Sequence, residues 1–533
     1  MCLLHLPALG AGEARNRFFR AQDLTVSFTC YISRPSAFGA ELSMKVSLAL
    51  FGLSLLVRGL SAQSVRRAGP TELAITHVTV IDVSSGVSNP DMTVEVAGNR
   101  IRAVRKSSHA ALPGYAHIVN GRGKFLIPGL WDMHVHALRD GRAHWMFPLF
   151  IAAGVLGIRD TGSPLDSLLF YRAGTAQGKV LGPRIFGTGP LLDGPQGQWP
   201  TFTVSVASPD EGRRAVDSLV RAGVDFIKVY NGLSREAFFA IADEARRRKV
   251  PVIGHVPQSV SALEASTAGM RSIEHLTQVP LVCIPDSVGQ AIEREWDRRT
   301  RSSSTTPDSI EALRLETVDR VAAAFSETLC EQRGAQFARN GTWQVPTHER
   351  TLHWTRAYLG SDTAGADTLL RYVPARVRTL WKHYQDSLLT LRSSADVEAR
   401  WYRLASRVIL SLHRGGDRIL AGTDTDGNDA NIYGVPGFAL HSELEAFVND
   451  VGLTPLEALR SSTLDAARFL GIADSAGMIA PGKFADLVLL DADPLRDIRN
   501  ARRIRGVIVN GRYLDRAALG RLLSSAKGTA TRW

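Results

Sequence analysis

The chain contains the stretch Leu126-Ile-Pro-Gly-Leu-Trp-Asp-Met-His-Val-His136, an apolar run that stops at its second histidine. Such a run is typical of a buried β-strand, in which residues two apart point to the same face of the sheet. His134 and His136 therefore aim their imidazoles at one point, where they could hold one metal ion. The pair predicts a metal-dependent hydrolase, provided that other segments supply further ligands.

Composition places the chain among ordinary globular proteins. Of its 533 residues, 44% are hydrophobic and 22% are charged, which is a usual balance for a packed fold. The length allows one large domain with a satellite, or two to three ordinary domains. The net charge of +11 is spread along the chain, and the densest basic runs are short and separate. Because no nucleic-acid-binding motif accompanies them, we expect a solvated basic surface rather than nucleic-acid binding.

The N-terminal region contains a pattern typical of an export signal. Met44-Lys45 precedes an apolar run from Val46 to Val57, and small residues follow up to Ala62. The run is shorter than the ~20 residues that span a bilayer, and the order of the parts is that of a secretory signal peptide. We expect a signal peptide at residues 44–62, an exported (periplasmic or secreted) protein without a stable membrane anchor, and a misassigned or disordered extension at residues 1–43. The alternative is an ordinary buried helix.

Two cysteines, Cys283 and Cys330, follow the predicted signal peptide. In an oxidising compartment the two could form a disulfide. Their spacing does not distinguish that pair from two free buried thiols. The sequence therefore leaves both states open.

Short alternating segments separated by turns occupy both ends of the remaining chain. The predicted strands lie at residues 74–81, 92–96, 101–104, 486–490 and 504–509. Asn510-Gly511 follows the last of them and is a strong hairpin signal. Two β-rich ends around an α/β middle predict one small β-sandwich built from both termini, with residues 63–127 as one half and residues 474–533 as the other.

The middle of the chain, residues 128–473, alternates predicted strands with helices such as Arg235 to Arg248. The eight strand candidates are 126–136, 154–160, 182–189, 224–230, 251–255, 272–275, 343–347 and 418–424. Eight β/α units predict an α/β fold of the TIM (β/α)8 barrel type. A helical insertion at about 283–340 and a second helical stretch at about 366–413 either cover the mouth of the barrel or decorate its outside.

Polar side chains stand at the ends of several predicted barrel strands. Besides the histidine pair on the first strand, Lys228 ends the fourth, His255 the fifth, His275 the sixth and Asp424 the eighth. Each residue alone has an ordinary explanation, such as a satisfied polar contact or a helix cap. Strand ends of a barrel meet at one face, and these residue types suit zinc. One shared metal site therefore explains the six residues better than six separate roles.

The strand ends lie in six motifs, which are Pro128-Gly-Leu-Trp-Asp-Met-His-Val-His136, Phe226-Ile-Lys-Val-Tyr230, Gly254-His-Val256, Glu274-His-Leu276, Ala421-Gly-Thr-Asp-Thr425 and, further on, Gly477-Met-Ile-Ala-Pro-Gly-Lys-Phe-Ala-Asp-Leu-Val-Leu489. With these motifs in this order, the sequence resembles the amidohydrolase superfamily, specifically its imidazolonepropionase-like and Xaa-Pro dipeptidase-like branch. The resemblance covers about residues 72–515.

The resemblance implies a centre with two metal ions, zinc or another divalent metal. His134, His136 and Asp424 would hold the more buried ion, and His255 and His275 would hold the second. Lys228 would bridge both ions as an N-carboxylated lysine. An ammonium group repels cations, whereas the added carboxylate offers two oxygens to two metals.

The resemblance also implies hydrolysis of a carbon–nitrogen bond in an amide, a cyclic amide or a small peptide by a metal-activated water. Asp424 would accept the proton of that water and deliver it to the leaving amine. Tyr230, on the same face as Lys228, would either contact the substrate or pack at the rim. We expect a small molecule or a dipeptide as substrate, and a homo-oligomer is compatible with this. The alternatives are a heterocycle ring-opening or deaminating hydrolase, and a catalytically inactive binding protein on the same fold.

Overall fold

The computed structural model describes residues 72–532 except 111–116, 198, 200, 301–306, 359–365, 390–392 and 429. The predicted signal peptide at 44–62 and the predicted extension at 1–43 lie outside the described residues, so both stay predictions. Within the described part of the chain, no helix is both long enough and apolar enough to cross a membrane.

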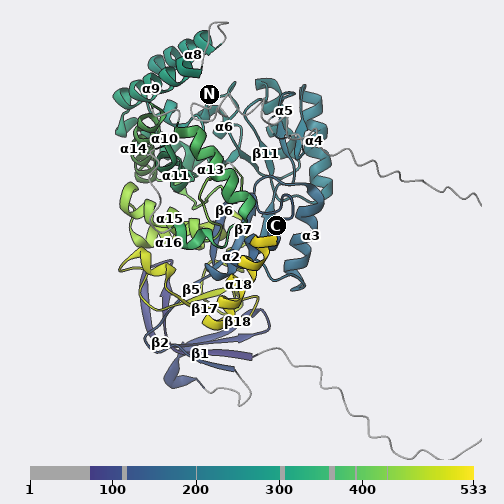
Figure 1. The fold of residues 1–533 in the computed structure, drawn as a ribbon, viewed down its shortest axis with the longest axis vertical. Coiled ribbons are helices and arrows are strands. Elements are labelled where there is room, and N and C mark those ends of the chain that lie inside the picture. The colour runs from purple at the N-terminus through teal and green to yellow at the C-terminus, as the bar shows by residue number, and fades with distance from the viewer. Residues whose placement is uncertain are drawn as a thin grey trace, which may run out of the picture. The chain divides into compact units, whose positions relative to one another are not determined.

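Strands from both ends of the described chain form one eight-stranded sheet, which runs β18-β17-β16-β5-β1-β2-β3 with β4 paired to β1. Figure 1 shows β1 and β2 near the yellow strands β17 and β18. The strands are β1 (Glu72–Asp82), β2 (Val87–Ala97), β3 (Arg100–Lys106), β4 (His117–Asn120), β5 (Phe125–Pro128), β16 (Leu487–Leu490), β17 (Ile504–Val509) and β18 (Arg512–Asp515). The predicted strands at both chain ends are confirmed.

The hairpin predicted at Asn510-Gly511 joins β17 to β18. Val509 pairs with Arg512 across it, and Asn510 and Gly511 have φ angles of 50° and 78°. Two consecutive positive φ angles are what a tight two-residue hairpin requires. This turn places β17 so that its other edge pairs with β16.

The middle of the chain folds into two parallel sheets. One runs β10-β9-β11-β12-β13-β14-β15 and the other β6-β7-β8. Their strands are β6 (Leu130–Val135), β7 (Val155–Asp160), β8 (Arg184–Gly187), β9 (Leu191–Asp193), β10 (Thr203–Ser205), β11 (Ile227–Val229), β12 (Val252–Gly254), β13 (Met270–Glu274), β14 (Trp343–Val345) and β15 (Arg418–Ile419). Each of the eight predicted segments contains a strand, so the α/β architecture is confirmed. Most of these strands are buried along their whole length, as parallel sheets covered by helices require.

Helices connect and cover these strands. They are α2 (Ala143–Ala152), α3 (Leu165–Ala176), α4 (Pro209–Ala222), α5 (Arg235–Arg247), α6 (Ala262–Thr267), α7 (Val279–Val282), α8 (Asp286–Thr300), α9 (Pro307–Ala324), α10 (Glu327–Asn340), α11 (His348–Tyr358), α12 (Ala366–Leu370), α13 (Ala375–Leu389), α14 (Ser393–Arg414), α15 (Phe438–Ala446), α16 (Pro455–Ser461), α17 (Leu464–Phe469) and α18 (Arg516–Arg532). Short η helices lie at Ser107–His109, Phe447–Val451 and Ile498–Arg502. The predicted helix at Arg235 is α5.

Backbone contacts connect the two parallel sheets at two places. The N–H of Asp225, just before β11, donates to the carbonyl of Gly187 at the end of β8 across 3.0 Å. At the second place, Val135 of β6 forms a parallel bridge with Thr425, beyond β15. The ends of β6 and of the segment after β15 are therefore neighbours.

The prediction of one strand from Leu126 to His136 was wrong. The segment divides at Gly129 into β5, which pairs antiparallel with β16, and β6, which pairs parallel with β7. A Cβ atom at Gly129 would lie 2.8 Å from the side chain of Leu156, so a glycine is needed at this crossing. The strands β9 and β10 were not predicted.

Three helices, α8 to α10, lie within residues 283–340, where the helical insertion was predicted. A disulfide joins Cys283, at the end of α7, to Cys330 on α10, with the two Cα atoms 4.4 Å apart. The structure therefore has the paired state that the sequence left open. The bond ties the beginning of the insertion to its last helix.

Candidate metal centre

Three side chains at strand ends converge on one point. His134, His275 and Asp424 offer ligand atoms that all lie within 4.8 Å of one another. His134 Nε2 is 3.3 Å from Asp424 Oδ1, and His275 Nε2 is 3.7 Å from Asp424 Oδ2. His136 Nε2 lies 3.2 Å from the same Oδ1 atom. Three of the six predicted ligands thus surround the carboxylate of a fourth, Asp424.

The other two predicted ligands lie beside this group. The ring of His255 stands edge-on to that of His275, with centroids 4.8 Å apart. Tyr230 stacks on His255 at 4.1 Å. Lys228 is buried; burial lowers its pKa to about 8, although the charges of Glu274 and Asp424 act to raise it. The structure therefore brings every predicted site residue to the same end of the parallel strands.

Each histidine is oriented through its Nδ1 atom. The oxygen partners of Nδ1 are Glu274 for His134, the carbonyl of Gly162 for His136, Asn231 for His255 and Thr347 for His275, at 2.6, 3.2, 2.9 and 2.7 Å. Metal-binding histidines are held in this way because the partner fixes the ring and its tautomer. In His134, His136 and His275 the Nε2 atom then faces Asp424.

Two of the converging residues have an unusual backbone conformation. His275 and Asp424 both have a φ angle of 57°, in the left-handed region that non-glycine residues rarely adopt. His275 directly follows β13, and Asp424 directly precedes Thr425, which bridges to Val135 of β6. The chain therefore turns at each residue that carries the polar group. Such strain is concentrated at functional sites, where the surrounding structure maintains it.

The electrostatics favour neutral imidazoles around ionised carboxylates. Burial, together with the charge of Arg139, lowers the pKa of His136 to about 3, and burial also places the pKa of His275 well below its usual value. Burial alone would raise the pKa of Asp424, but the neighbouring histidines hold it well below its usual range. Neutral imidazole and carboxylate are the forms that bind divalent cations.

Sequence reasoning missed the groups behind the centre. Arg159 is fully buried and donates from one nitrogen to both oxygens of Glu274 at 2.9 Å. Glu274 in turn binds His134. Glu274 could have been predicted from its position next to His275 in the motif Glu274-His-Leu276. No pattern in the sequence indicates a role for Arg159.

Two further arginines stand close to the predicted ligands. Arg350, on α11, places its Nε atom 3.1 Å from Asp424 Oδ2. Arg139 follows His136 by three residues and is buried beside Phe202. Neither was predicted, since an isolated arginine in a loop or helix has no pattern that separates it from a surface residue.

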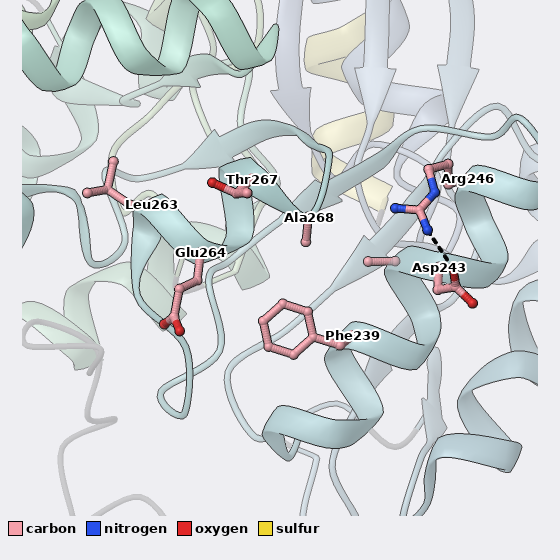
Figure 2. Close-up of a pocket in the computed structure, with 8 residues that line it drawn as sticks. Phe239, Asp243, Arg246, Leu263, Glu264, Thr267 and Ala268 are labelled. Atoms are coloured by element: carbon pink, nitrogen blue, oxygen red, sulfur yellow. Dashed lines mark hydrogen bonds and ion pairs between the residues drawn. The ribbon is translucent and has the colours of Figure 1, made fainter.

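A hollow of about 430 Å³ lies elsewhere, between α5 and α6 (Figure 2). Phe239 and the ion pair of Asp243 with Arg246 line it from α5, and Leu263 and Glu264 line it from α6. No predicted site residue is among its lining residues. The hollow is therefore not the candidate active site.

Comparison with known proteins agrees with this geometry. Residues 405–514 match the model of the amidohydrolase family. The predicted resemblance to the amidohydrolase family is thereby confirmed for this part of the chain. Among its relatives, ochratoxinase from Aspergillus niger is 22% identical over 430 residues, which cover 70% of this chain and 72% of ochratoxinase. Imidazolonepropionase from Vibrio parahaemolyticus is 40% identical over 87 residues, or 15% of this chain and 21% of that protein.

Solved structures of amidohydrolases share the fold. A candidate prolidase from Bifidobacterium longum has a TM-score of 0.60 at 25% identity, covering 86% of this chain and 99% of its own. Bottromycin amidohydrolase has a TM-score of 0.67 at 24% identity, with 86% and 91% covered. An Xaa-Pro dipeptidase has a TM-score of 0.57 at 20% identity, with 83% and 100% covered. The family match and these relatives support the prediction of a hydrolase that acts on carbon–nitrogen bonds.

Proposed function

We propose that this amidohydrolase uses a metal-activated water to hydrolyse an amide bond in a small substrate, such as a dipeptide or a cyclic amide. The observation that carries the proposal is the convergence of His134, His275 and Asp424 on ligand atoms within 4.8 Å of one another. The names of the relatives, ochratoxinase and Xaa-Pro dipeptidase, favour amides over other carbon–nitrogen bonds.

The residues present fit a divalent metal. Imidazole nitrogens and carboxylate oxygens are the donors that zinc prefers. His134 Nε2 is buried and makes no hydrogen bond within the described residues, and a metal would satisfy it. We assign His134, His136 and Asp424 to one ion and His255 and His275 to a second. Lys228, carboxylated, would bridge the two ions.

The chemistry divides between the metal and the protein. When bound, the ions would lower the pKa of a water molecule and polarise the scissile carbonyl. Asp424 is placed to accept the proton of the water and to return it to the leaving nitrogen. Arg350 holds one oxygen of Asp424, which orients the carboxylate for this transfer. Tyr230, stacked on His255, would contact the carbonyl or carboxylate of the substrate.

We further propose that the two parallel sheets form one TIM barrel at residues 128–473, and that residues 63–127 and 474–533 form a small β-sandwich. The contacts between Asp225 and Gly187 and between Val135 and Thr425 support closure of the barrel. In a barrel the six predicted ligands share the C-terminal face, where such enzymes keep their active sites. Export through residues 44–62 is part of the same proposal.

Metal analysis combined with a substrate panel tests the function. Purified protein is analysed for bound metal and assayed on dipeptides, cyclic amides and nitrogen heterocycles, with and without a chelator. We expect bound metal, and amide hydrolysis that the chelator abolishes and added Zn²⁺ restores. Ammonia release from heterocycles alone would favour a deaminating hydrolase. Absence of both metal and chelator-sensitive turnover would contradict any metal-dependent hydrolase.

A further inference from the structure

The peptide group between Thr423 and Asp424 is held at both of its polar ends. Its N–H, on Asp424, donates to the carbonyl of His134 at 2.7 Å. Its carbonyl, on Thr423, accepts from the side chain of Asn431 at 2.7 Å. Because a peptide group is planar, these two bonds fix its orientation. They hold Asp424 at its φ angle of 57°, which a non-glycine residue keeps only where the surroundings impose it.

Asn431 is fully buried, and its carboxamide has one possible orientation. A backbone carbonyl only accepts hydrogen bonds, so the atom that faces Thr423 must be the amide nitrogen. That nitrogen also donates to Glu349 Oε2 at 2.9 Å. The amide oxygen lies 3.1 Å from His353 Nδ1, which can donate to it. Two side chains of α11 therefore orient the group that binds Thr423.

The surroundings of Asn431 leave its side chain little room to move. A Cβ atom on Gly434 would lie 2.4 Å from Asn431 Cγ, so the chain closes around the carboxamide within three residues. On the other side, the N–H of Glu349 donates to Glu443 Oε2 on α15 at 2.6 Å. His353 Nε2 lies 3.1 Å from Glu349 Oε1. A series of fixed contacts thus runs from α15 through α11 to Asn431.

Asn431 holds the peptide group that precedes Asp424, whereas Arg350 contacts the carboxylate itself. Loss of the amide would leave the buried carbonyl of Thr423 without this donor, which is unfavourable. The peptide group could then rotate and release the strain at Asp424. Rotation would turn the carboxylate away from His134 Nε2, which is 3.3 Å from it.

We propose that Asn431 is a positioning residue, which holds the backbone turn at Asp424 so that its carboxylate can take the proton of the attacking water. This inference rests on the proposed function, in which Asp424 is the proton acceptor. Displacement of a reacting group by about 1 Å can cost about 100-fold in rate. The amide of Asn431 therefore acts on the rate of the chemical step and not on the binding of substrate.

Asn431→Ala tests this role with two measurements. In the Zn²⁺-loaded enzyme, with L-alanyl-L-phenylalanine as substrate, kcat should fall about 10- to 100-fold. KM should not change, because the variant displaces the proton acceptor and leaves the groups that bind substrate in place. Amide hydrogen exchange at residues 423–428 should be faster than in the wild type, because the peptide group that carries the N–H of Asp424 is held on one side only. An unchanged kcat, or unchanged exchange at these residues, would overturn the role of Asn431.

Gln344→Ala is the matched control. Gln344 is also a fully buried amide, and its nitrogen donates to Asp417 Oδ2 at 3.0 Å. Asp417 lies directly before β15, whereas Asp424 lies beyond its end. The control should lose stability in urea unfolding but keep kcat and the exchange at residues 423–428. A fall of kcat as large as in Asn431→Ala would show that lost stability lowers the rate, and would overturn the inference.

Asn431→Leu covers the case in which the alanine variant folds poorly. Leucine has the branched shape of asparagine and opens no cavity, but it has no N–H to donate to Thr423. Its kcat should fall as in Asn431→Ala, and wild-type kcat in this variant would overturn the role.

The exchange measurement does not depend on activity, so it separates the inference from the proposed function. Absence of chelator-sensitive turnover of amides in the wild type would contradict the proposed function. Faster exchange at residues 423–428 in Asn431→Ala would still show that Asn431 holds the turn at Asp424, and unchanged exchange would overturn that contact whatever the activity.

Discussion

His134 Nδ1 and Glu274 Oε2 are 2.6 Å apart, and both side chains are buried. Burial alone would raise the pKa of Glu274, but Arg159 and His134 hold it at about 2, so the carboxylate accepts and His134 donates. The proton on Nδ1 leaves a lone pair on Nε2, which faces Asp424. A buried arginine thereby determines which nitrogen of His134 is available to a metal.

Glu274→Gln should weaken metal binding by about 10- to 100-fold, as loss of a group that orients a ligand does. It should also lower the free energy of unfolding by about 3–5 kcal/mol, because Arg159 is left buried without its carboxylate. Competition with a chelating dye and urea unfolding measure the two effects. The double variant Arg159→Met/Glu274→Gln should recover stability but not metal affinity. Wild-type affinity in Glu274→Gln would contradict the orienting role.

Asp424→Asn should reduce kcat by about 10²- to 10⁴-fold, the usual contribution of a general base. The amide keeps the shape of the side chain and one oxygen for a metal, so most of the bound metal should remain. Steady-state kinetics and metal analysis of the same preparation check both points. Unchanged turnover would remove Asp424 from the role of proton acceptor.

Glu349→Gln should flatten the pH dependence of stability. Burial raises the pKa of Glu349 to about 8, so above its ordinary pKa the unfolded chain releases a proton that the native state keeps. The wild type should therefore lose stability as pH rises from about 5 to 8. The glutamine variant can still accept the 2.9 Å hydrogen bond from Asn431 but has no proton to lose.

Urea unfolding of both proteins at pH 5, 6, 7 and 8 measures this difference. The exposed Glu236→Gln is the control and should follow the wild type. Stability curves of wild type and Glu349→Gln that stay parallel over this range would show that Glu349 does not titrate there.

Replacing Cys283 and Cys330 with alanine should lower the free energy of unfolding by about 2–4 kcal/mol, because the disulfide closes a loop of 47 residues in the unfolded chain. Metal content should not change, since neither cysteine contacts a predicted ligand in the described residues. Urea unfolding with and without reductant gives the size of the effect. An alanine pair as stable as the oxidised wild type would contradict it.

Much of the candidate site could be predicted because the ends of buried strands can be recognised from the residue pattern. Each predicted ligand follows a short apolar run, and parallel strands place such positions at one edge. Arg159 could not be predicted, because its burial depends on Glu274, 115 residues away. The break at Gly129 was missed for the same reason, since it depends on Leu156 and on the carbonyl of Asp486, which accepts from Gly129.

The eight-stranded sheet imposes an order on biosynthesis. β5 ends at Pro128, and its partner β16 begins at Leu487. The ribosome therefore synthesises β5 long before the strand that pairs with one of its edges. At roughly 5–20 residues per second, this edge of β5 lacks β16 for a time on the order of tens of seconds. An unpaired apolar strand edge invites pairing with other chains. Nascent chains of this enzyme should therefore depend on a chaperone or on slow-growth expression more than its finished fold suggests.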